Sequence, residues 1–438
     1  MAVFYTSYVR RTKYEDLITT RHKFDQLQSD IRSDVAIIGG GFTGLSAAYN
    51  LAQNGVSTIL LEGGTIGDGA SGRNGGQIGV GHRSWVSELE HLYGKTFTQD
   101  IMSLWLDARR HLNDLLCLCD MPAHLQGHIS AIHRYSKRRE YRDNIDDMAR
   151  YGYEGLMYLN KSQICDRLGS KRYYGGVYDS NTGHINPLQL VVNLAKVASN
   201  AGANLYENSP VIRIEKKPYH FIIETDKVKI TADKVLIASN GYSIGKIKSD
   251  SLSAEIKKIT QHIFPIYSYI AATEPLPLDT DILPNNESVD DSRFAVRYFR
   301  KERDNSLIFG GAETYYGTPL CRIREIIHKQ IIEVYPQLGK VNLTHGWGGI
   351  VAITRKRMPY IQELHPGLVY CGGYSGHGVC LAPYIGKLYA DMLINPDEQK
   401  QKIKCFKSLK NLPFWGGRYL SVPALFLALN WYALKDKL

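Results

Sequence analysis

The sequence predicts an α/β protein, α+β overall, in which two structural units share the chain in alternating segments. Two observations predict the first unit: a short apolar strand, a glycine-rich turn and an amphipathic helix occur in that order at residues 34–54 and again at 368–394. The third observation is the different patterning of residues 89–171 and 244–345, which lie between. With 438 residues, the chain is longer than one compact core usually is.

Residues 34–62 form the first strand–turn–helix unit. The apolar run Val35–Ile38 predicts a buried parallel strand, and helical periodicity begins at Thr43. Gly55 stands where a helix ends, and Thr58–Leu61 predicts a second buried strand. A strand, a crossover helix and a parallel strand are typical of a Rossmann-like domain.

The turn of this unit has the spacing G-x-G-x-x-G. Gly39 allows a tight turn, Gly41 leaves room for a pyrophosphate, and Gly44 lets the helix pack on the strand. The helix start offers free N–H groups to phosphates, and Glu62, 23 residues past Gly39, can accept hydrogen bonds from an adenosine ribose. A plain βαβ turn is the alternative. The predicted dinucleotide-binding residues are Gly39, Gly41, Phe42, Thr43, Gly44 and Glu62.

A long glycine-rich loop, Gly67–Gln77, follows the second strand directly. An NAD-type fold usually continues there to its next crossover helix, so the loop favours a flavin dinucleotide, along which it can run. A flexible surface loop is the alternative. The donors and backbone positions expected to contact the cofactor are Ser71, Arg73, Asn74, Gly76 and Gln77.

The second glycine-rich junction follows the strand Leu368–Cys371 and opens a helix that extends to about Ile394. Because the first junction accounts for the phosphates, a second helix N-terminus suits the flavin end at which reduction builds negative charge. The turn after strand Val235–Ala238 can approach the middle of the cofactor, and Trp347 either forms a wall of the flavin pocket or packs in the core. These observations add Asn240, Gly241, Trp347, Gly376, His377, Gly378 and Val379 to the expected contacts.

The remaining pattern predicts the division of the chain. We expect a lead-in at 1–33, a cofactor-binding domain at 34–88, 172–243 and 346–395, a substrate domain at 89–171 and 244–345, and a C-terminal extension at 396–438. Helices are expected at 95–119, 138–150, 187–201 and 320–335, and further strands at 221–225, 228–231, 263–272, 293–300 and 306–310.

Composition limits the class of protein. The formal charge of +10 is concentrated at 134–142, 246–258 and 400–410, which predicts solvated faces or affinity for acidic lipids, nucleic acid or an anionic substrate. Seven scattered cysteines indicate a reducing compartment, hence a cytoplasmic protein, and no cysteine–histidine cluster has metal-ligand spacing. The start lacks a signal-peptide pattern, and the apolar stretch 422–434 is too short to span a bilayer. It predicts a docked amphipathic helix or a weak contact with a membrane surface.

With both junctions placed, the chain resembles the D-amino-acid oxidase, glycine oxidase and sarcosine oxidase superfamily of FAD enzymes, and within it most resembles the bacterial gamma-glutamylputrescine oxidases. The matching stretches are GGGFTGLSAA, GASGRNGGQI, GHINPLQL, SNGY, YFRKERDNSLIFGG, WGGIVAITRKRMP, GYSGHGV and LPFWGGRYLSVP. The resemblance implies an FAD domain interdigitated with a substrate domain built on a mixed sheet, and adds Val211 as a backbone contact to adenine. Some relatives attach FAD through a cysteine, but residues 345–370 contain none, so we expect non-covalent FAD.

Three residues are the catalytic candidates. Tyr298 and Arg300 share a strand face, where Arg300 could grip a substrate carboxylate with two hydrogen bonds or could be an ordinary surface arginine. His377 could contact the flavin or the substrate, or transfer a proton. A basic surrounding, to which Arg73 would contribute, favours the neutral amine that hydride transfer requires.

The expected function is oxidation of an amine, of the gamma-glutamylputrescine type, by hydride transfer to FAD, with oxygen as acceptor and with an aldehyde, ammonia and hydrogen peroxide as products. The first alternative is a dehydrogenase of the same fold that passes electrons to a quinone or carrier. The second is an RNA-modifying flavoprotein, although the sequence shows no RNA-binding module, and the third is a non-catalytic flavin binder.

Overall fold

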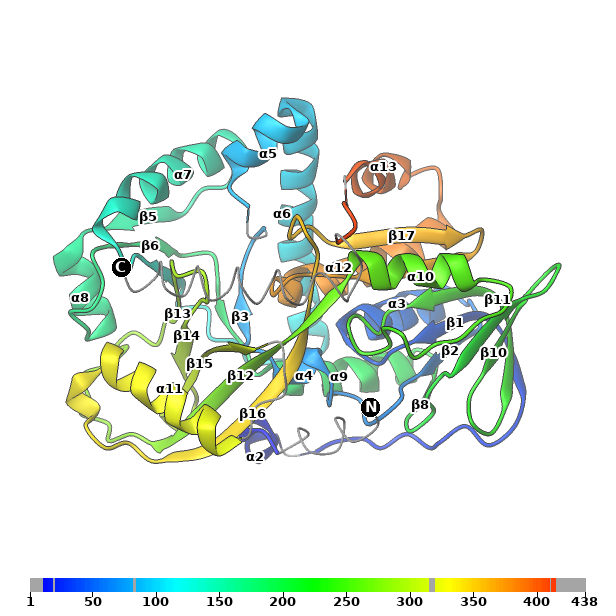
Figure 1. The fold of residues 1–438 in the computed structure, drawn as a ribbon, viewed down its shortest axis with the longest axis horizontal. Helices are drawn as coiled ribbons and strands as arrows, with labels where there is room; N and C mark the ends of the chain where they lie inside the picture. Colours follow the sequence, from blue (N-terminus) through cyan, green and yellow to red (C-terminus); the bar gives the residue numbers. More distant parts are fainter. Residues whose placement is uncertain (1–10, 19, 82–83, 315–319, 410, 415–438) are drawn as a thin grey trace.

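The computed structural model describes residues 11–18, 20–81, 84–314, 320–409 and 411–414. Within them two eight-stranded sheets lie side by side, with the long helix α6 (Lys95–Leu118) between them (Figure 1). Both sheets contain parallel and antiparallel pairs, which confirms the predicted α/β class with mixed sheets. Residues 422–434, for which a helix is predicted, lie outside the described residues.

The first sheet has the strand order β17-β18-β11-β1-β2-β8, with β10 paired to β11 and β9 paired to β10. Val35 and Ile37 of β1 belong to one apolar cluster, and Ala36 and Ile38 belong to another on the opposite face. Burial on both faces explains why the strand is a continuous apolar run. The strands are β1 (Ile31–Ile38), β2 (Thr58–Leu61), β8 (Asn204–Tyr206), β9 (Arg213–Lys216), β10 (Phe221–Glu224), β11 (Lys229–Ile237), β17 (Tyr360–His365) and β18 (Leu368–Gly372).

The second sheet has the order β16-β12-β15-β14-β13-β4-β6-β5. Its long strands β12 and β16 pair along most of their length and extend towards the first sheet (Figure 1). The strands are β4 (His128–Ala131), β5 (Leu156–Leu159), β6 (Gly176–Asp179), β12 (Phe264–Pro275), β13 (Ser288–Asp291), β14 (Tyr298–Lys301), β15 (Ser306–Thr314) and β16 (Leu343–Ile353). A separate pair joins β3 (Gln77–Ile78) to β7 (Gly183–His184).

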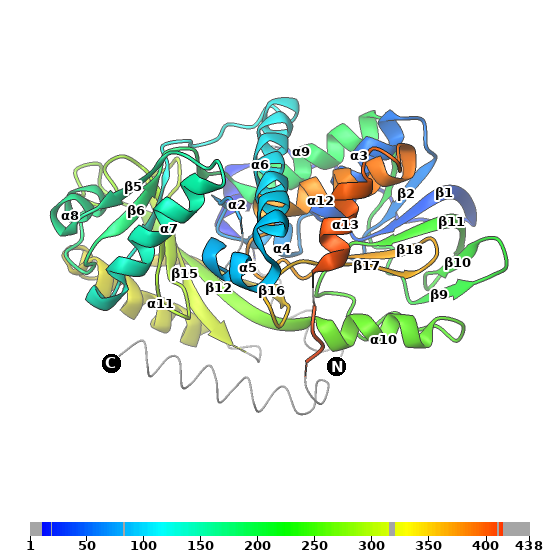
Figure 2. The ribbon, with the colours of Figure 1, turned by 90° about the horizontal axis from the view of Figure 1, so that it is seen from above.

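Helices α3 (Phe42–Gln53), α9 (Pro187–Asn200) and α12 (Gly378–Ile394) pack beside one another in the first unit, and α6 packs on α12. Seen from above, α6 and α13 (Lys400–Ser408) lie next to each other (Figure 2). The other helices are α2 (Lys13–Leu17), α4 (Ala70–Arg73), α5 (Val86–Tyr93), α7 (Arg138–Arg150), α8 (Lys161–Leu168), α10 (Ser253–His262) and α11 (Leu320–Val334). None of the helices in the described ranges is long and apolar enough to cross a bilayer.

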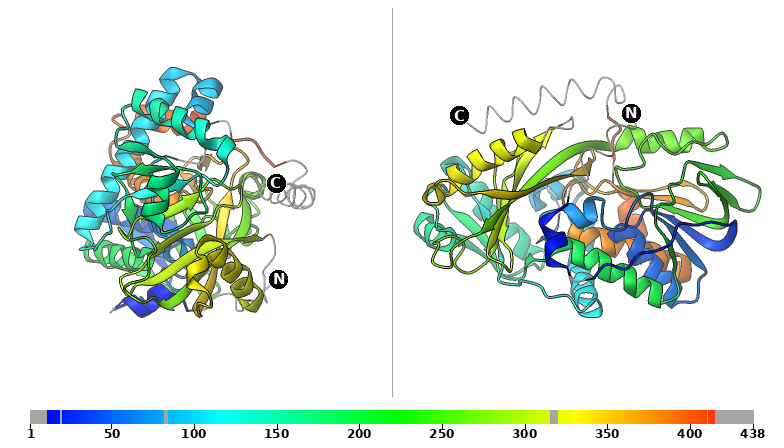
Figure 3. Two further views of the ribbon diagram at one scale, coloured as in Figure 1. Left: turned by 90° about the vertical axis from the view of Figure 1, so that its left-hand side faces the viewer. Right: turned by 90° about the horizontal axis from the view of Figure 1, so that it is seen from below.

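Several local predictions need correction. The lead-in is not irregular throughout: it contains α2, which contacts α9 (Figure 3), and β1 begins at Ile31. The strands predicted at 228–231 and 235–238 are one strand, β11, because it pairs with β1 from Ile230 to Ile237. The strand predicted at 293–300 begins only at Tyr298, since the Asp291 carboxylate accepts hydrogen bonds from the backbone N–H groups of Arg293 and Arg297 and closes a turn.

The division into domains stays a prediction, although the two sheets separate most of the expected segments. Strands β6 and β16 fall in segments assigned to the cofactor-binding domain, yet both lie in the second sheet. β16 is placed there by its pairing with β12, from Leu343 to Ile353.

Candidate flavin and substrate site

The turn between β1 and α3 accepts only glycine at its key positions. Gly39 has a φ of 113°, and a Cβ there would lie 2.9 Å from the Ser239 backbone. A Cβ on Gly44 would lie 2.0 Å from the Gly39 carbonyl oxygen, so the helix start packs directly on the turn. Gly41, the N-cap residue of α3, has no side chain with which to cap the helix, so N–H groups of its first turn can bind a phosphate.

Ser71 reaches this helix start from the glycine-rich loop. Its Oγ accepts a hydrogen bond of 3.0 Å from the backbone N–H of Phe42. Because the hydroxyl is the acceptor there, its own proton can be donated to a phosphate oxygen. Thr43, the next residue, is joined through its Oγ1 to the Tyr374 hydroxyl at 2.6 Å, which ties the α3 start to the turn before α12.

Glu62 lies at the end of β2, where an adenosine ribose is expected. Its two carboxylate oxygens accept hydrogen bonds from the backbone N–H groups of Gly40 at 2.8 Å and Gly64 at 2.9 Å. Burial raises the pKa of Glu62, against the effect of those two donors. Each oxygen keeps a lone pair, so the side chain can still accept ribose hydroxyls. A Cβ on Gly63 would be 3.6 Å from Pro210, so the segment that contains Val211 borders this turn.

The loop Gly67–Gln77 is an ordered element that contains α4. Arg73 donates through Nε to the Asp68 carbonyl at 2.8 Å, and Asn74 donates to the carbonyls of Ala70 and Ser71. The Asn74 side chain also accepts from the Gly76 N–H at 2.8 Å. These contacts contradict a flexible loop, and they show that Arg73 and Asn74 use side-chain groups to fold the loop.

The far end of the loop is held on both sides. Gln77 pairs with His184 in the β3–β7 ladder. A Cβ on Gly75 would be 2.8 Å from the Tyr298 ring, and one on Gly76 would be 2.1 Å from the Ile185 carbonyl oxygen. The loop backbone is therefore packed closely against Tyr298 of β14 and against Ile185, which follows β7.

The second junction lies at the same edge of the first sheet, since β1, β11 and β18 are parallel neighbours. Asn240, after β11, accepts a hydrogen bond of 2.9 Å from the Gly373 N–H, which connects the two turns. Tyr242, just past Gly241, accepts one of 3.1 Å from the Ile350 N–H. The chain then passes through Gly376, with a φ of 95°, to the start of α12.

His377 precedes α12 at the position where a capping side chain would stand, and makes no such capping bond. Gly378 and Val379 form the first helical positions, and Gly376 has open space where a Cβ would be. The N-termini of α3 and α12 thus lie at one sheet edge, and neither N-cap residue, Gly41 or His377, caps its helix with its own side chain. Together with Glu62, they fit the phosphates, the ring and the ribose of FAD.

Trp347 is fully buried and has a structural contact in the loop. Its Nε1 donates to the Arg73 carbonyl at 3.0 Å, and its ring meets Tyr14 edge-on with centroids 5.2 Å apart. Tyr14, in α2, donates through its hydroxyl to the Asn74 carbonyl at 2.8 Å. The sequence reasoning missed Tyr14, whose one signal is a lone aromatic residue in a charged segment.

Arg300 is not placed at the mouth of a pocket. Its side chain is 0% exposed, forms an ion pair of 2.5 Å with Glu302, and donates through Nε to the Gly75 carbonyl at 2.6 Å. Its Nη1 lies 3.2 Å from His184 Nδ1. His184 Nε2 donates to the Asn286 carbonyl, so Nδ1 is the acceptor for Arg300. These contacts favour a structural role and leave the guanidinium no free edge for a carboxylate.

Tyr298 does share the face of Arg300, as alternation along a strand requires. Both side chains reach the glycine loop, Tyr298 at Gly75 and Arg300 at Gly75 and Gly76. The Tyr298 hydroxyl lies 3.3 Å from Ser268 Oγ. Tyr298 is therefore the candidate on the second sheet that borders the expected flavin ring.

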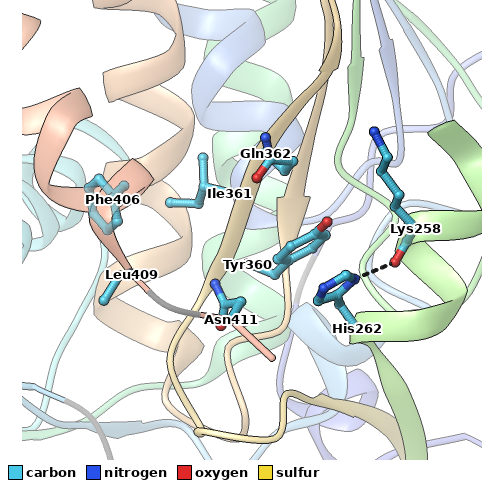
Figure 4. Close-up of a pocket in the computed structure, with 8 residues that line it drawn as sticks. All are labelled: Lys258, His262, Tyr360, Ile361, Gln362, Phe406, Leu409 and Asn411. Atoms are coloured by element: carbon cyan, nitrogen blue, oxygen red, sulfur yellow. Dashed lines mark hydrogen bonds between the residues drawn. The ribbon is translucent and has the colours of Figure 1, made fainter. Parts of the chain in front are cut away.

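A separate cavity of about 260 Å³ lies between α10, β17 and α13 (Figure 4). The His262 ring stacks on Tyr360 with centroids 4.7 Å apart at its wall. None of the cofactor or catalytic candidates lines this cavity. Its lining is Lys258, His262, Tyr360, Ile361, Gln362, Phe406, Leu409 and Asn411.

Comparisons with known proteins agree with this geometry. A probable oxidoreductase, OrdL, of Rhizobium meliloti (strain 1021) is 44% identical over 430 residues, covering 97% of this chain and 97% of the relative. The gamma-glutamylputrescine oxidoreductase of Escherichia coli (strain K12) is 30% identical over 421 residues, covering 95% of each chain.

Solved structures share the fold. Glycine oxidase from Bacillus cereus ATCC 14579 aligns with a TM-score of 0.71 and 21% identity, over 87% of this chain and 99% of that one. L-proline dehydrogenase from P. horikoshii aligns with a TM-score of 0.70 and 19% identity, over 86% and 97%.

The family model DAO, described as FAD dependent oxidoreductase, matches residues 34–392, from within β1 to the last turn of α12. Both glycine-rich junctions lie within that match, as do both sheets apart from the first three residues of β1. The chain therefore belongs to the DAO family of FAD-dependent oxidoreductases.

Proposed function

We propose that the protein oxidises a primary amine of the gamma-glutamylputrescine type, with oxygen as the electron acceptor. The observation that supports this most is the meeting of two helix N-termini at one sheet edge, opposite Tyr298 of the second sheet. A relative that bears the name gamma-glutamylputrescine oxidoreductase, 30% identical over 95% of the chain, supports the substrate class.

The residues proposed to contact FAD are those predicted from the sequence, and the structure suggests which part of FAD each group of residues would contact. The N–H groups at the start of α3 and the Ser71 hydroxyl would bind the pyrophosphate, and Glu62 the ribose. Gly75 and Gly76 would let the backbone lie against the isoalloxazine ring. Arg73, Asn74 and Trp347 would act indirectly, by holding the loop in shape.

When bound, FAD would act as the acceptor of a hydride from the carbon next to the amine nitrogen. The protein's part is to place that carbon and to keep water away until transfer is complete. The positive end of α12 favours negative charge near His377 by roughly 0.3–1 kcal/mol. The Tyr298 ring, clamped over Gly75, would limit how the substrate lies. The released imine then hydrolyses to an aldehyde and ammonia.

The main alternative is a different electron acceptor in place of oxygen, because the structural relatives include both an oxidase and a dehydrogenase by name. A dehydrogenase would pass electrons to a quinone or a carrier. Peroxide released in step with amine consumption would support the oxidase, whereas turnover only with an artificial carrier would support the dehydrogenase.

The test of the function is an anaerobic screen. Amines and amino acids are mixed with the yellow holoenzyme, and loss of flavin absorbance is followed. Bleaching by gamma-glutamylputrescine or a close analogue is expected. If amino acids bleach the flavin and amines do not, the substrate class is wrong.

We also infer a reducing, cytoplasmic setting and no nucleic-acid partner. All seven cysteines are free, and four of them, Cys119, Cys371, Cys380 and Cys405, are buried.

A further inference from the structure

A polar cluster on the second sheet has no part in the mechanism above. Asp290, in β13, lies in register between Tyr298 of β14 and Ser130 of β4. Residues paired across neighbouring strands project from the same face of a sheet. Because Tyr298 contacts Gly75, the face that bears Asp290 is the one turned towards the glycine loop.

Asp290 differs sharply from its neighbour in the chain. The Asp291 side chain, on the opposite face, is 0% exposed and forms an ion pair with Arg293. The Asp290 side chain is 37% exposed, although its strand runs between two others. A carboxylate that stays accessible in the middle of a sheet, on the face towards the proposed flavin, can receive a ligand.

His128 holds one oxygen of this carboxylate. Its Nε2 lies 3.3 Å from Asp290 Oδ1, and its Nδ1 lies 2.8 Å from Ser288 Oγ. The Ser288 hydroxyl also lies 3.1 Å from the Gly183 carbonyl oxygen, so Ser288 fixes the orientation of the His128 ring beside the carboxylate.

The surroundings keep Asp290 negatively charged. Burial opposes the charged form, but His128, the Ser130 hydroxyl and His377 outweigh it, so the pKa of Asp290 is lowered.

Aromatic rings stand beside the carboxylate. Tyr141, in α7, has its pKa raised by burial and, next, by the charge of Asp290. Trp85 packs edge-on against Tyr141 with ring centroids 5.1 Å apart. Tyr298 is the cross-strand neighbour on the other side. A carboxylate among tyrosine rings is a suitable binding site for an ammonium group, which can form a charge-assisted hydrogen bond with the carboxylate and cation–π contacts with the rings.

We propose that Asp290 binds a second, non-reacting cationic nitrogen of the substrate. The reacting amine must be neutral when its C–H bond breaks, and an adjacent carboxylate would hold it protonated. Asp290 therefore suits the other nitrogen. This inference rests on the proposed function and narrows its substrates to diamines and to acylated diamines that keep an ammonium group elsewhere.

The test compares matched ligands that differ by one ammonium group. The first pair is 1,4-diaminobutane and 1-aminobutane, and the second is gamma-glutamylputrescine and its glutaryl analogue, which lacks only the α-ammonium. Binding is measured by calorimetry on holoenzyme reduced with dithionite, so that no oxidation occurs. In at least one pair, Asp290→Asn should weaken binding of the ligand with the additional ammonium group by about 10- to 100-fold. Binding of the other ligand of that pair should weaken by less than about threefold. Asp290→Glu should recover part of the loss.

The control is Asp143→Asn, in an exposed pair on α7, which should leave all four affinities unchanged. Flavin absorbance of each purified variant verifies that FAD is bound. Equal weakening within each pair, or no weakening, would overturn the role of Asp290. Failure of wild-type holoenzyme to be bleached by any amine would instead count against the proposed function, because binding to the reduced enzyme does not depend on turnover.

Discussion

At the scale of single residues, Glu62 stabilises the turn through two backbone N–H groups and is the proposed ligand of the FAD ribose. The Gln substitution keeps the side-chain shape and removes the charge, so we expect Glu62→Gln to lower FAD affinity by about ten- to a hundredfold, the equivalent of roughly 1.5–3 kcal/mol for a charge-assisted hydrogen bond. Titration of apoprotein with FAD, followed by quenching of flavin fluorescence, measures this. An affinity equal to wild type would exclude Glu62 as a ribose ligand.

Arg300 gives the second residue-scale prediction. Arg300→Met would leave the carboxylate of Glu302 buried without its counter-charge, at a cost of about 3–5 kcal/mol in the free energy of unfolding. Adding Glu302→Gln should restore much of the loss. Urea unfolding measures both. A normal stability combined with a KM that rises only for amines bearing a carboxylate would instead support the substrate-binding role expected from the sequence.

At the scale of elements, the contact between α3 and the turn after β1 is the most sensitive. Gly44→Ala would push a methyl group to within 2.0 Å of the Gly39 carbonyl oxygen, so we expect little folded, yellow protein. Gly79→Ala is the matched control, because nothing lies within 4 Å of a Cβ there. Expression and the ratio of flavin to protein absorbance compare the two, and a yellow, stable Gly44→Ala would show that the helix start can move.

An element is predictable from the sequence when local patterns determine it, and much less so when contacts with remote residues do. Helices α3, α7 and α12 follow from local periodicity and glycine signals, and their bounds agree with prediction within a residue or two. The short strands β4 and β5 were not predicted, because pairing partners in the sheet are remote: β4 pairs with β13, 160 positions away. The burial of Arg300 could not be predicted for the same reason, since its partners Gly75 and His184 are 225 and 116 positions away. The cluster around Asp290 could not be predicted from the sequence, because only the pairing register of β13 and β4 brings Ser130 beside Asp290.

At the scale of the whole molecule, buried neutral histidines set the response to acid. Burial, then Lys387, lowers the pKa of His111 to about 4, and burial, then Arg293, lowers that of His133 to about 3. Burial and Arg300 place the pKa of His184 well below 6.5. In the unfolded chain these groups bind protons below about pH 6.5 while the native state does not, so stability must fall as pH drops.

The expected slope is roughly 1 kcal/mol per pH unit for each such histidine between about pH 6 and 4.5. The raised pKa values of Glu62, Asp179 and Asp291 act in the opposite sense at the acid end. Urea unfolding at pH 6.5, 5.5 and 4.5 measures the slope. His111→Asn should make it shallower, whereas substitution of the exposed His91 should not. A stability that does not change over this range would contradict the assignment.

Tyr14 has a consequence for the order in which the protein can be made. Tyr14 precedes Trp347 by 333 positions, yet its ring and hydroxyl contact Trp347, Arg300 and Asn74 in the folded protein. During synthesis, α2 therefore leaves the ribosome long before Arg300 and Trp347 do. Until they emerge, the glycine-rich loop lacks the aromatic side chains that pack against it. A nascent chain should become able to retain flavin only after β16 has left the exit tunnel.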